Sequence, residues 1–189
     1  MKNIAIFASG SGSNAENIIN YFKNDSENVV KIVFCNNTDD YVLERAKRLN
    51  VPTIVFGRDE FYHSDVVLNE LKRLDIDLIV LAGFLWKVPE AIIDAYPNRV
   101  INIHPALLPS YGGKGMYGMK VHEAVIAAGE KESGITIHYV NDHYDEGATI
   151  FQAKCTIVPE DTPETLATKV HALEYEYFPG VIEKTLKEF

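Results

Sequence analysis

The chain has few of the features that mark membrane, secreted or metal-binding proteins. Among 189 residues there are two cysteines, Cys35 and Cys155, without Cys-x-x-Cys or Cys/His ligand spacing. We therefore expect buried reduced thiols and no bound metal. The longest apolar run, Leu78–Trp86, is far below the roughly 20 residues that span a membrane. The first run, Ile4–Ala8, is too short for a signal peptide, and we expect a cytoplasmic protein.

Positive charge is also scarce. Lysine and arginine total 18 against 27 aspartates and glutamates, which gives a net charge of −9. Proteins that bind nucleic acid usually carry a basic face, so this class is disfavoured. The chain is 47% hydrophobic and 24% charged, as is normal for a globular protein. We expect one domain over residues 1–189 that binds small molecules, as a monomer or weak homodimer.

Short apolar runs alternate with helical repeats along the first half. Strands are predicted at Ile4–Ala8, Val29–Cys35, Thr53–Phe56, Leu78–Leu81 and Arg99–Ile103. Helices are predicted at Ala15–Phe22, Leu43–Leu49, Val66–Leu74 and Ala91–Ala95. This alternation is typical of βαβ units and a parallel sheet.

The second half has a different pattern. A glycine-rich loop, Ser110–Gly118, precedes a predicted helix and two strands that we expect to be antiparallel. These three elements are Val121–Ala128, Ile135–Val140 and Thr149–Ile157. The last helix has Thr162 as N-cap and Pro163 in its first turn, and Pro179 should kink or interrupt it. The predicted fold class is α/β, with a Rossmann-like open twisted sheet. The sheet is mostly parallel with an antiparallel C-terminal part, and helices cover both faces.

The loop after the first predicted strand is a candidate anion site. Gly10–Ala15 opens a helix, and amides at a helix N-terminus bind phosphate. The loop also fits the dinucleotide pattern G-x-G-x-x-A, which needs an acid at the end of the second strand. Here that strand ends in Asn36 and Asn37, so a simple phosphate is favoured over NAD. A tight turn without a ligand remains the alternative.

Three further places hold candidate polar groups. Asn102 and His104 lie two residues apart at the end of a strand, so they share one face. The turn Asn141–Gly147 holds several acids, and a carboxylate beside an imidazole raises its pKa. An ordinary solvated turn is the alternative. Glu174 lies on the apolar side of the last helix, where it is either an amine partner or a solvated edge residue.

Taken together, these residues resemble the formyltransferases that act on tetrahydrofolate. The resemblance runs from Met1 to about Phe178. It rests on Ser9–Asn14, Leu43–Ala46, Leu81–Phe84, Asn102–Pro109, His138–Gly147, Gln152–Lys154 and Glu174. The resemblance implies formyl transfer from 10-formyltetrahydrofolate to the amine of glycinamide ribonucleotide, in purine synthesis and without a metal. It further implies a nucleotide-binding half, residues 1–104, and a half for folate and catalysis, residues 105–189.

The resemblance also implies roles for individual residues. The catalytic residues are Asn102, His104 and Asp145. Asp145 is chosen over Asp142 and Glu146 because the family's aspartate lies two residues before this glycine, Gly147. The substrate phosphate, ribose and amine are assigned to Gly12, Ser13, Asn14 and Glu174. Folate is assigned to Leu85, Trp86, Lys87, Val88, Asn102, Asn141 and Asp142.

The chain departs from the family pattern in two places. Leu85–Lys87 replaces the usual Met-Arg after Ala-Gly-Phe, and the loop Gly112–Gly118 is longer and richer in glycine. Two alternatives to the main interpretation remain. One is a non-catalytic phosphate-binding module, which leaves Asn102, His104 and Asp145 unexplained. The other is a formyltransferase that acts on a different amine.

Overall fold

The computed structural model describes residues 1–189, and its residues form two compact units. The first contains Met1–Ile101 and Ile182–Phe189, and the second contains Asn102–Val181. The strands are β1 (Lys2–Ala8), β2 (Asn28–Cys35), β3 (Thr53–Val55), β4 (Leu78–Leu81), β5 (Val100–His104), β6 (Glu132–Tyr139) and β7 (Thr149–Thr156). The helices are α1 (Ser13–Phe22), α2 (Val42–Arg48), α3 (Arg58–Tyr62), α4 (Val66–Arg73), α5 (Glu90–Ala95), α6 (Met119–Ala127) and α7 (Pro163–Leu186).

The strands follow the order β3-β2-β1-β4-β5-β6-β7 in one open sheet. β1 is parallel to both β2 and β4, and β2 is parallel to β3. β6 and β7 are antiparallel, with Glu132 opposite Thr156 and Ile137 opposite Phe151. The predicted fold class, a mostly parallel Rossmann-like sheet with an antiparallel C-terminal part, is confirmed.

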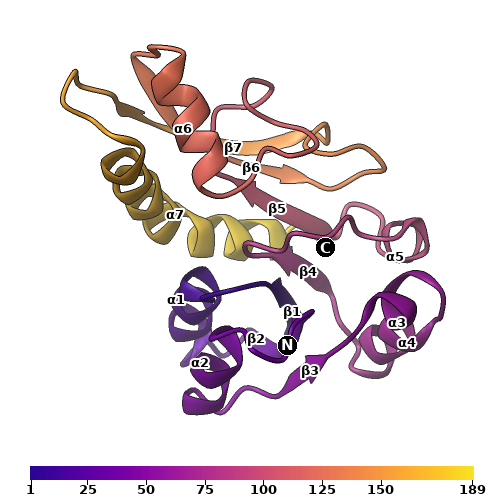
Figure 1. Cartoon of the computed structure of the whole chain (residues 1–189). Helices are drawn as coiled ribbons and strands as arrows, with labels where there is room; N and C mark the ends of the chain where they lie inside the picture. Colours follow the sequence, from indigo (N-terminus) through magenta and orange to yellow (C-terminus); the bar gives the residue numbers. More distant parts are fainter. The chain divides into compact units, whose positions relative to one another are not determined.

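The first unit is built around the buried strands β1 and β4. Every residue of β4 is buried, as expected for a strand covered on both faces. Phe7 of β1 stacks on Phe34 of β2 with ring centroids 4.7 Å apart. In Figure 1, α1 and α2 lie on one side of these strands, and α3 and α4 lie on the other.

Several local predictions hold at residue level. The Thr162 hydroxyl accepts a hydrogen bond from the Thr165 amide at 3.3 Å, and α7 begins at Pro163. Thr162 is therefore the N-cap that the sequence indicated. Both cysteines are free, and Cys35 is buried as predicted. The predicted burial of Cys155 was wrong: this thiol is half-buried, because β7 is an edge strand of the sheet.

Other local predictions need correction. The helix α3 was not predicted, although Gly57 donates to the Glu60 carboxylate at 2.6 Å, which is a local N-terminal capping contact. Burial of Phe61 among other aromatic rings stabilises this short helix. Of the two effects predicted for Pro179, a kink or an interruption, the interruption was wrong, since α7 runs from Pro163 to Leu186. The helix continues because Phe178 and Ile182, on either side of the proline, are fully buried. No helix of the chain combines the length and the apolar character that a bilayer crossing requires.

Candidate active site

Asn102 and His104 lie at the end of β5, where the alternation of a strand puts them on one face. The His104 side chain is 4% exposed, and Asn102 is half-buried. Asn102 Nδ2 lies 3.2 Å from Nε2 of His138, which is on β6 and also buried. A second imidazole therefore joins the pair that the sequence predicted.

The His138 ring fixes the orientation of the Asn102 amide. His138 Nδ1 lies 2.9 Å from the Tyr139 carbonyl oxygen. Because a carbonyl only accepts, Nδ1 carries a hydrogen, and when the ring is neutral its lone pair is then on Nε2. That lone pair accepts one N–H of the Asn102 amide. The second N–H of the same amide is then directed elsewhere in the site.

A backbone carbonyl likewise fixes the position of a hydrogen on the His104 ring. Its Nε2 lies 2.7 Å from the Tyr111 carbonyl oxygen, so Nε2 carries a hydrogen. Nδ1 lies 3.5 Å from Oδ2 of Asp145 and is the nitrogen that gains or loses a proton. Burial lowers the pKa of His104; the Asp145 charge and the Tyr111 carbonyl oppose this without cancelling it.

Asp145 lies between the two buried imidazoles. Oδ1 is 3.5 Å from His138 Nε2, and Oδ2 accepts the Gly113 amide at 3.0 Å. Burial opposes ionisation of Asp145, but His138, His104 and the Gly113 amide outweigh it and lower the pKa of the carboxyl group. Asp142 of the same turn is exposed. The structure thus brings Asp145 to Asn102 and His104.

The segment that follows β5 is fastened to β6 and β7. The buried Thr136 hydroxyl donates to the Ala106 carbonyl at 2.7 Å and accepts the Leu108 amide at 3.0 Å. Gln152 donates to the Leu108 carbonyl at 3.0 Å. A Cβ on Gly112 would contact the Leu108 side chain and would lie 3.3 Å from the Asp145 Cβ. A side chain at position 112 would therefore have to displace the end of the Leu108 side chain and would crowd Asp145.

Glu174 is a buried carboxylate on α7, 4% exposed. Its Oε2 lies 2.9 Å from His171 Nδ1, and this contact raises the pKa of His171. His122 of α6 is 2% exposed, and its Nδ1 has no partner. Burial lowers the pKa of His122, and the charges of His171, Glu174 and His104 also act on it. The second unit therefore gathers Glu174 with several histidines.

Two of these histidines were missed as site residues. His138 shares a face of β6 with Thr136, and that alternation is visible in the sequence. Its contact with Asn102 depends on how β6 lies beside β5, which no local pattern gives. His122 follows the apolar repeat of α6 and has no sequence signal that separates it from a core residue.

The phosphate candidates lie in the first unit. Gly12 is the N-cap of α1, in the left-handed region with φ 72°, and Ser13 is the first helical residue. A Cβ on Gly12 would contact Val42 of α2. The Gly10 amide donates to Asp40 at 2.7 Å, and Arg45 donates to the Ser11 carbonyl at 2.8 Å. The loop that leads into α1 is thereby held in one shape.

The residues assigned to folate are divided between the units. Leu85, at 55% exposed, and the buried Val88 belong to the first unit, as does Trp86. The Arg58 guanidinium lies over the Trp86 ring, 4.6 Å from its centroid. The Lys87 carbonyl accepts the Tyr62 hydroxyl at 2.9 Å. Asn141 and Asp142 are exposed and belong to the second unit.

Known proteins resemble this chain over most of its length. The family model described as "Formyl transferase" matches residues 2–182. The chain is 38% identical to the chloroplastic phosphoribosylglycinamide formyltransferase of Arabidopsis thaliana, over 98% of this chain and 67% of that protein. It is 33% identical to the phosphoribosylglycinamide formyltransferase of Bacillus subtilis, over 98% of this chain and 95% of that protein.

A solved structure gives the same result. Glycinamide ribonucleotide transformylase 1 from Geobacillus kaustophilus superposes with a TM-score of 0.89 at 37% identity, over 98% of this chain and 99% of that one. The family indicated by the sequence motifs is thereby confirmed. The chain belongs to the formyl transferase family, in the group of the phosphoribosylglycinamide formyltransferases.

Proposed function

We propose that this chain transfers a formyl group from 10-formyltetrahydrofolate to the amine of glycinamide ribonucleotide, with Asn102, His104 and Asp145 as its catalytic residues. The observation that carries the residue assignment is the position of the Asp145 carboxylate, 3.5 Å from one nitrogen of His104 and of His138. The Asn102 amide completes the group. The names of the relatives supply the reaction class and the acceptor.

The formyl end of the donor fits the chemistry of this cluster. When bound, 10-formyltetrahydrofolate supplies an activated formyl carbon on a nitrogen that can leave. A formyl oxygen needs hydrogen-bond donors, and the cluster offers the second N–H of Asn102 beside a titratable imidazole. Buried, pre-oriented donors of this kind stabilise a developing oxyanion.

We assign Asn102 the role of hydrogen-bond donor to the oxyanion that develops on the formyl oxygen. Its amide is held by His138, so it does not need to reorient as charge develops on the formyl oxygen. Removing one such donor typically lowers the rate by ~10²–10³. His138 is then a positioning residue, because it acts through Asn102.

We assign His104 the role of general acid, which transfers a proton during the reaction. The attacking amine loses one proton as its bond to the formyl carbon forms, and the leaving nitrogen gains one as its bond breaks. Protonated Nδ1 of His104 can give its proton to the leaving nitrogen. The proton lost by the attacking amine then reprotonates Nδ1, so the number of protons balances. General acid catalysis of this kind contributes roughly 10²–10⁴ in rate. Asp145 stabilises the charged ring, since its carboxyl pKa is lowered and it faces Nδ1.

The remaining assignments follow the chemistry of each position. Gly12, Ser13 and Asn14 form the N-terminus of α1, where amides favour a phosphate. Glu174 is a buried carboxylate suited to an amine. Leu85–Val88, Asn141 and Asp142 are assigned to folate by the family resemblance. The acceptor and donor are the only small-molecule partners proposed.

The direct test is an assay of tetrahydrofolate release with purified protein, 10-formyltetrahydrofolate and glycinamide ribonucleotide. We expect turnover with this acceptor, and at least ~10²-fold slower turnover in Asn102→Ala and in His104→Ala. Asn24→Ala, at an exposed asparagine between α1 and β2 with no assigned role, is the control for Asn102→Ala. Release only with a different amine would replace the acceptor. No release with any amine, from protein that binds both ligands, would contradict catalysis.

A further inference from the structure

Tyr111 has an unusual backbone conformation next to His104. Its φ is +56°, in the left-handed region that residues other than glycine rarely adopt. Its carbonyl oxygen is the acceptor for His104 Nε2 at 2.7 Å. A conformation of this kind persists only when surrounding contacts hold it. The contact that orients the catalytic ring therefore depends on whatever fixes Tyr111.

Thr136 and Gln152 hold the start of the segment that follows β5. Their hydrogen bonds are to Ala106 and Leu108, which precede Tyr111 in the chain. Beyond Tyr111, the Gly113 amide reaches Asp145. At Tyr111 itself, the phenol donates to Oε1 of Glu130 at 2.7 Å. This bond also raises the pKa of the Tyr111 phenol, which keeps it protonated and donating.

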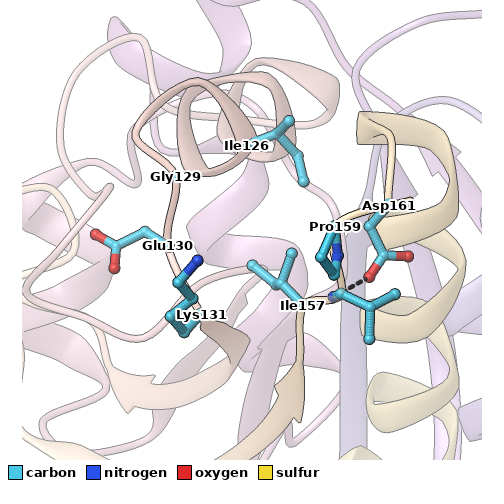
Figure 2. A pocket seen from close by; sticks show the side chains of 8 residues that line it. Ile126, Gly129, Glu130, Lys131, Ile157, Pro159 and Asp161 are labelled. Carbon is cyan, nitrogen blue, oxygen red and sulfur yellow. Dashed lines mark hydrogen bonds between the residues drawn. The ribbon is translucent and has the colours of Figure 1, made fainter.

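Glu130 lies just after α6 and beside a small hollow of about 210 Å³. The apolar wall of the hollow includes Ile126, Ile157 and Pro159, and Figure 2 shows the Glu130 carboxylate directed away from them. The hollow is smaller than the roughly 300 Å³ of the smallest usual ligand pockets. The structure gives Glu130 a hydrogen-bond partner in Tyr111.

We propose that Glu130 is a positioning residue for the reaction, because its hydrogen bond to the Tyr111 phenol holds the Tyr111 carbonyl on His104 Nε2. The inference rests on the proposed function in taking His104 as the catalytic acid. Glu130 acts through Tyr111, its hydrogen-bond partner. Through the Tyr111 carbonyl it keeps the hydrogen on Nε2 of His104. Nδ1, which faces Asp145, is then the nitrogen that exchanges the catalytic proton.

The Tyr111 carbonyl acts in the same direction as Asp145 on the charge of the ring. Both raise the pKa of His104, whereas burial lowers it, as does His138 when its ring is charged; Glu174 raises it and lies on α7. His122 of α6 also interacts with His104. If the Tyr111 carbonyl moves away, the protonated ring loses one of its acceptors. The pKa of His104 should then fall.

The test combines Tyr111→Phe and Glu130→Ala, which both remove the hydrogen bond, with Glu130→Gln, which keeps an acceptor. A single exposed hydrogen bond corresponds to a change of about 2- to 10-fold. We expect kcat to fall by about that factor in the first two variants, with the KM values unchanged. In imidazole ¹⁵N spectra the His104 hydrogen should spread from Nε2 to both nitrogens. Glu130→Gln should retain most of the wild-type kcat.

The chain offers a matched control. Tyr21 donates to Glu183 at 2.6 Å, also on the surface but within the first unit. Tyr21→Phe should therefore leave kcat and the His104 spectrum unchanged. The double variant Tyr111→Phe/Glu130→Ala should be no slower than either single variant, because both remove one interaction.

The outcomes separate this inference from the proposed function. An unchanged His104 spectrum and unchanged kcat in Tyr111→Phe would overturn the positioning role, even if formyl transfer is normal. Equal losses in Tyr21→Phe, or additive losses in the double variant, would also overturn it. A shifted spectrum in a protein that transfers no formyl group would leave the positioning role intact and contradict the catalytic assignment.

Discussion

Asp145 lies 3.5 Å from one nitrogen of each of two buried histidines, His104 and His138. It raises the pKa of His104 against the effect of burial. Asp145→Asn removes that charge, so the pKa of His104 should fall and the protonated ring should be lost at lower pH. We expect the high-pH limb of the rate profile to move down and turnover at pH 7 to decrease. A pH–rate series with NMR titration of His104 measures both effects.

Asp142→Asn is the control for this change. Asp142 lies in the same turn and is exposed, so its neutral variant should leave the high-pH limb nearly in place. If Asp142→Asn moves the high-pH limb and Asp145→Asn does not, the assignment to Asp145 is wrong and Asp142 carries the role. If neither variant moves the limb, His104 is not the group that sets it.

The N-terminal turn of α1 is an element whose shape depends on Gly12. Gly12 and Gly83 both have left-handed φ values, +72° and +73°, but an added Cβ meets Val42 only at Gly12. Each alanine variant loses about 1–2 kcal/mol from its backbone conformation. Gly12→Ala should therefore be less stable than Gly83→Ala in urea unfolding. Equal urea midpoints for the two variants would show that the turn accommodates the added Cβ beside Val42 without loss of stability.

The same pair tests the phosphate assignment. Gly12→Ala, and more strongly Gly12→Val, should weaken glycinamide ribonucleotide binding in titration calorimetry, while folate binding is retained. Gly83→Ala should bind the nucleotide as the wild type does. A parallel loss of both affinities in the Gly12 variants would mean that the turn is only structural.

The start of α7 depends on Asp161. Its carboxylate pairs with Lys169 at 2.5 Å and accepts the Val158 amide and the Thr165 hydroxyl. The Lys169 hydrogen bond, followed by the Val158 amide, lowers the pKa of Asp161 from 3.8 to about 2. A lowered pKa stabilises the fold above the unfolded value, and this stability is lost as the pH falls through the folded value.

Asp161→Asn should therefore lower the Tm at pH 7, and the difference from the wild type should shrink between about pH 4 and pH 2. Thermal unfolding followed by circular dichroism over this range measures it. Glu160→Gln, an exposed neighbour, should have little effect. A constant difference at every pH would show that the carboxylate charge is not what stabilises the helix.

At the scale of the whole molecule, the expectation from the sequence analysis is a monomer or weak homodimer that acts on small molecules. Light scattering after size exclusion should give a mass near 21.2 kDa, or a dimer that dissociates on dilution. Specific activity should not depend on protein concentration. A stable larger assembly would contradict this prediction.

Much of the fold follows from local patterns. The apolar run Leu78–Leu81 could only be a strand covered on both faces, and Thr162 with Pro163 marked the start of α7. The resemblance of the motifs to the family indicated the reaction class, and the alternation of a strand placed Asn102 and His104 on one face. These features depend on neighbours within a few residues, which the sequence contains.

The tertiary structure decided the rest. Asn102 meets His138 across 36 positions of sequence, and Tyr111 meets Glu130 across 19. Such pairs depend on how strands lie beside one another and on the left-handed backbone at Tyr111 and Asp145. Sequence patterns alone gave Asp142 and Asp145 equal standing, and the family motif favoured Asp145. Their different contacts arise because only one of them is turned toward the buried imidazoles, and that direction is set by packing rather than by residue type.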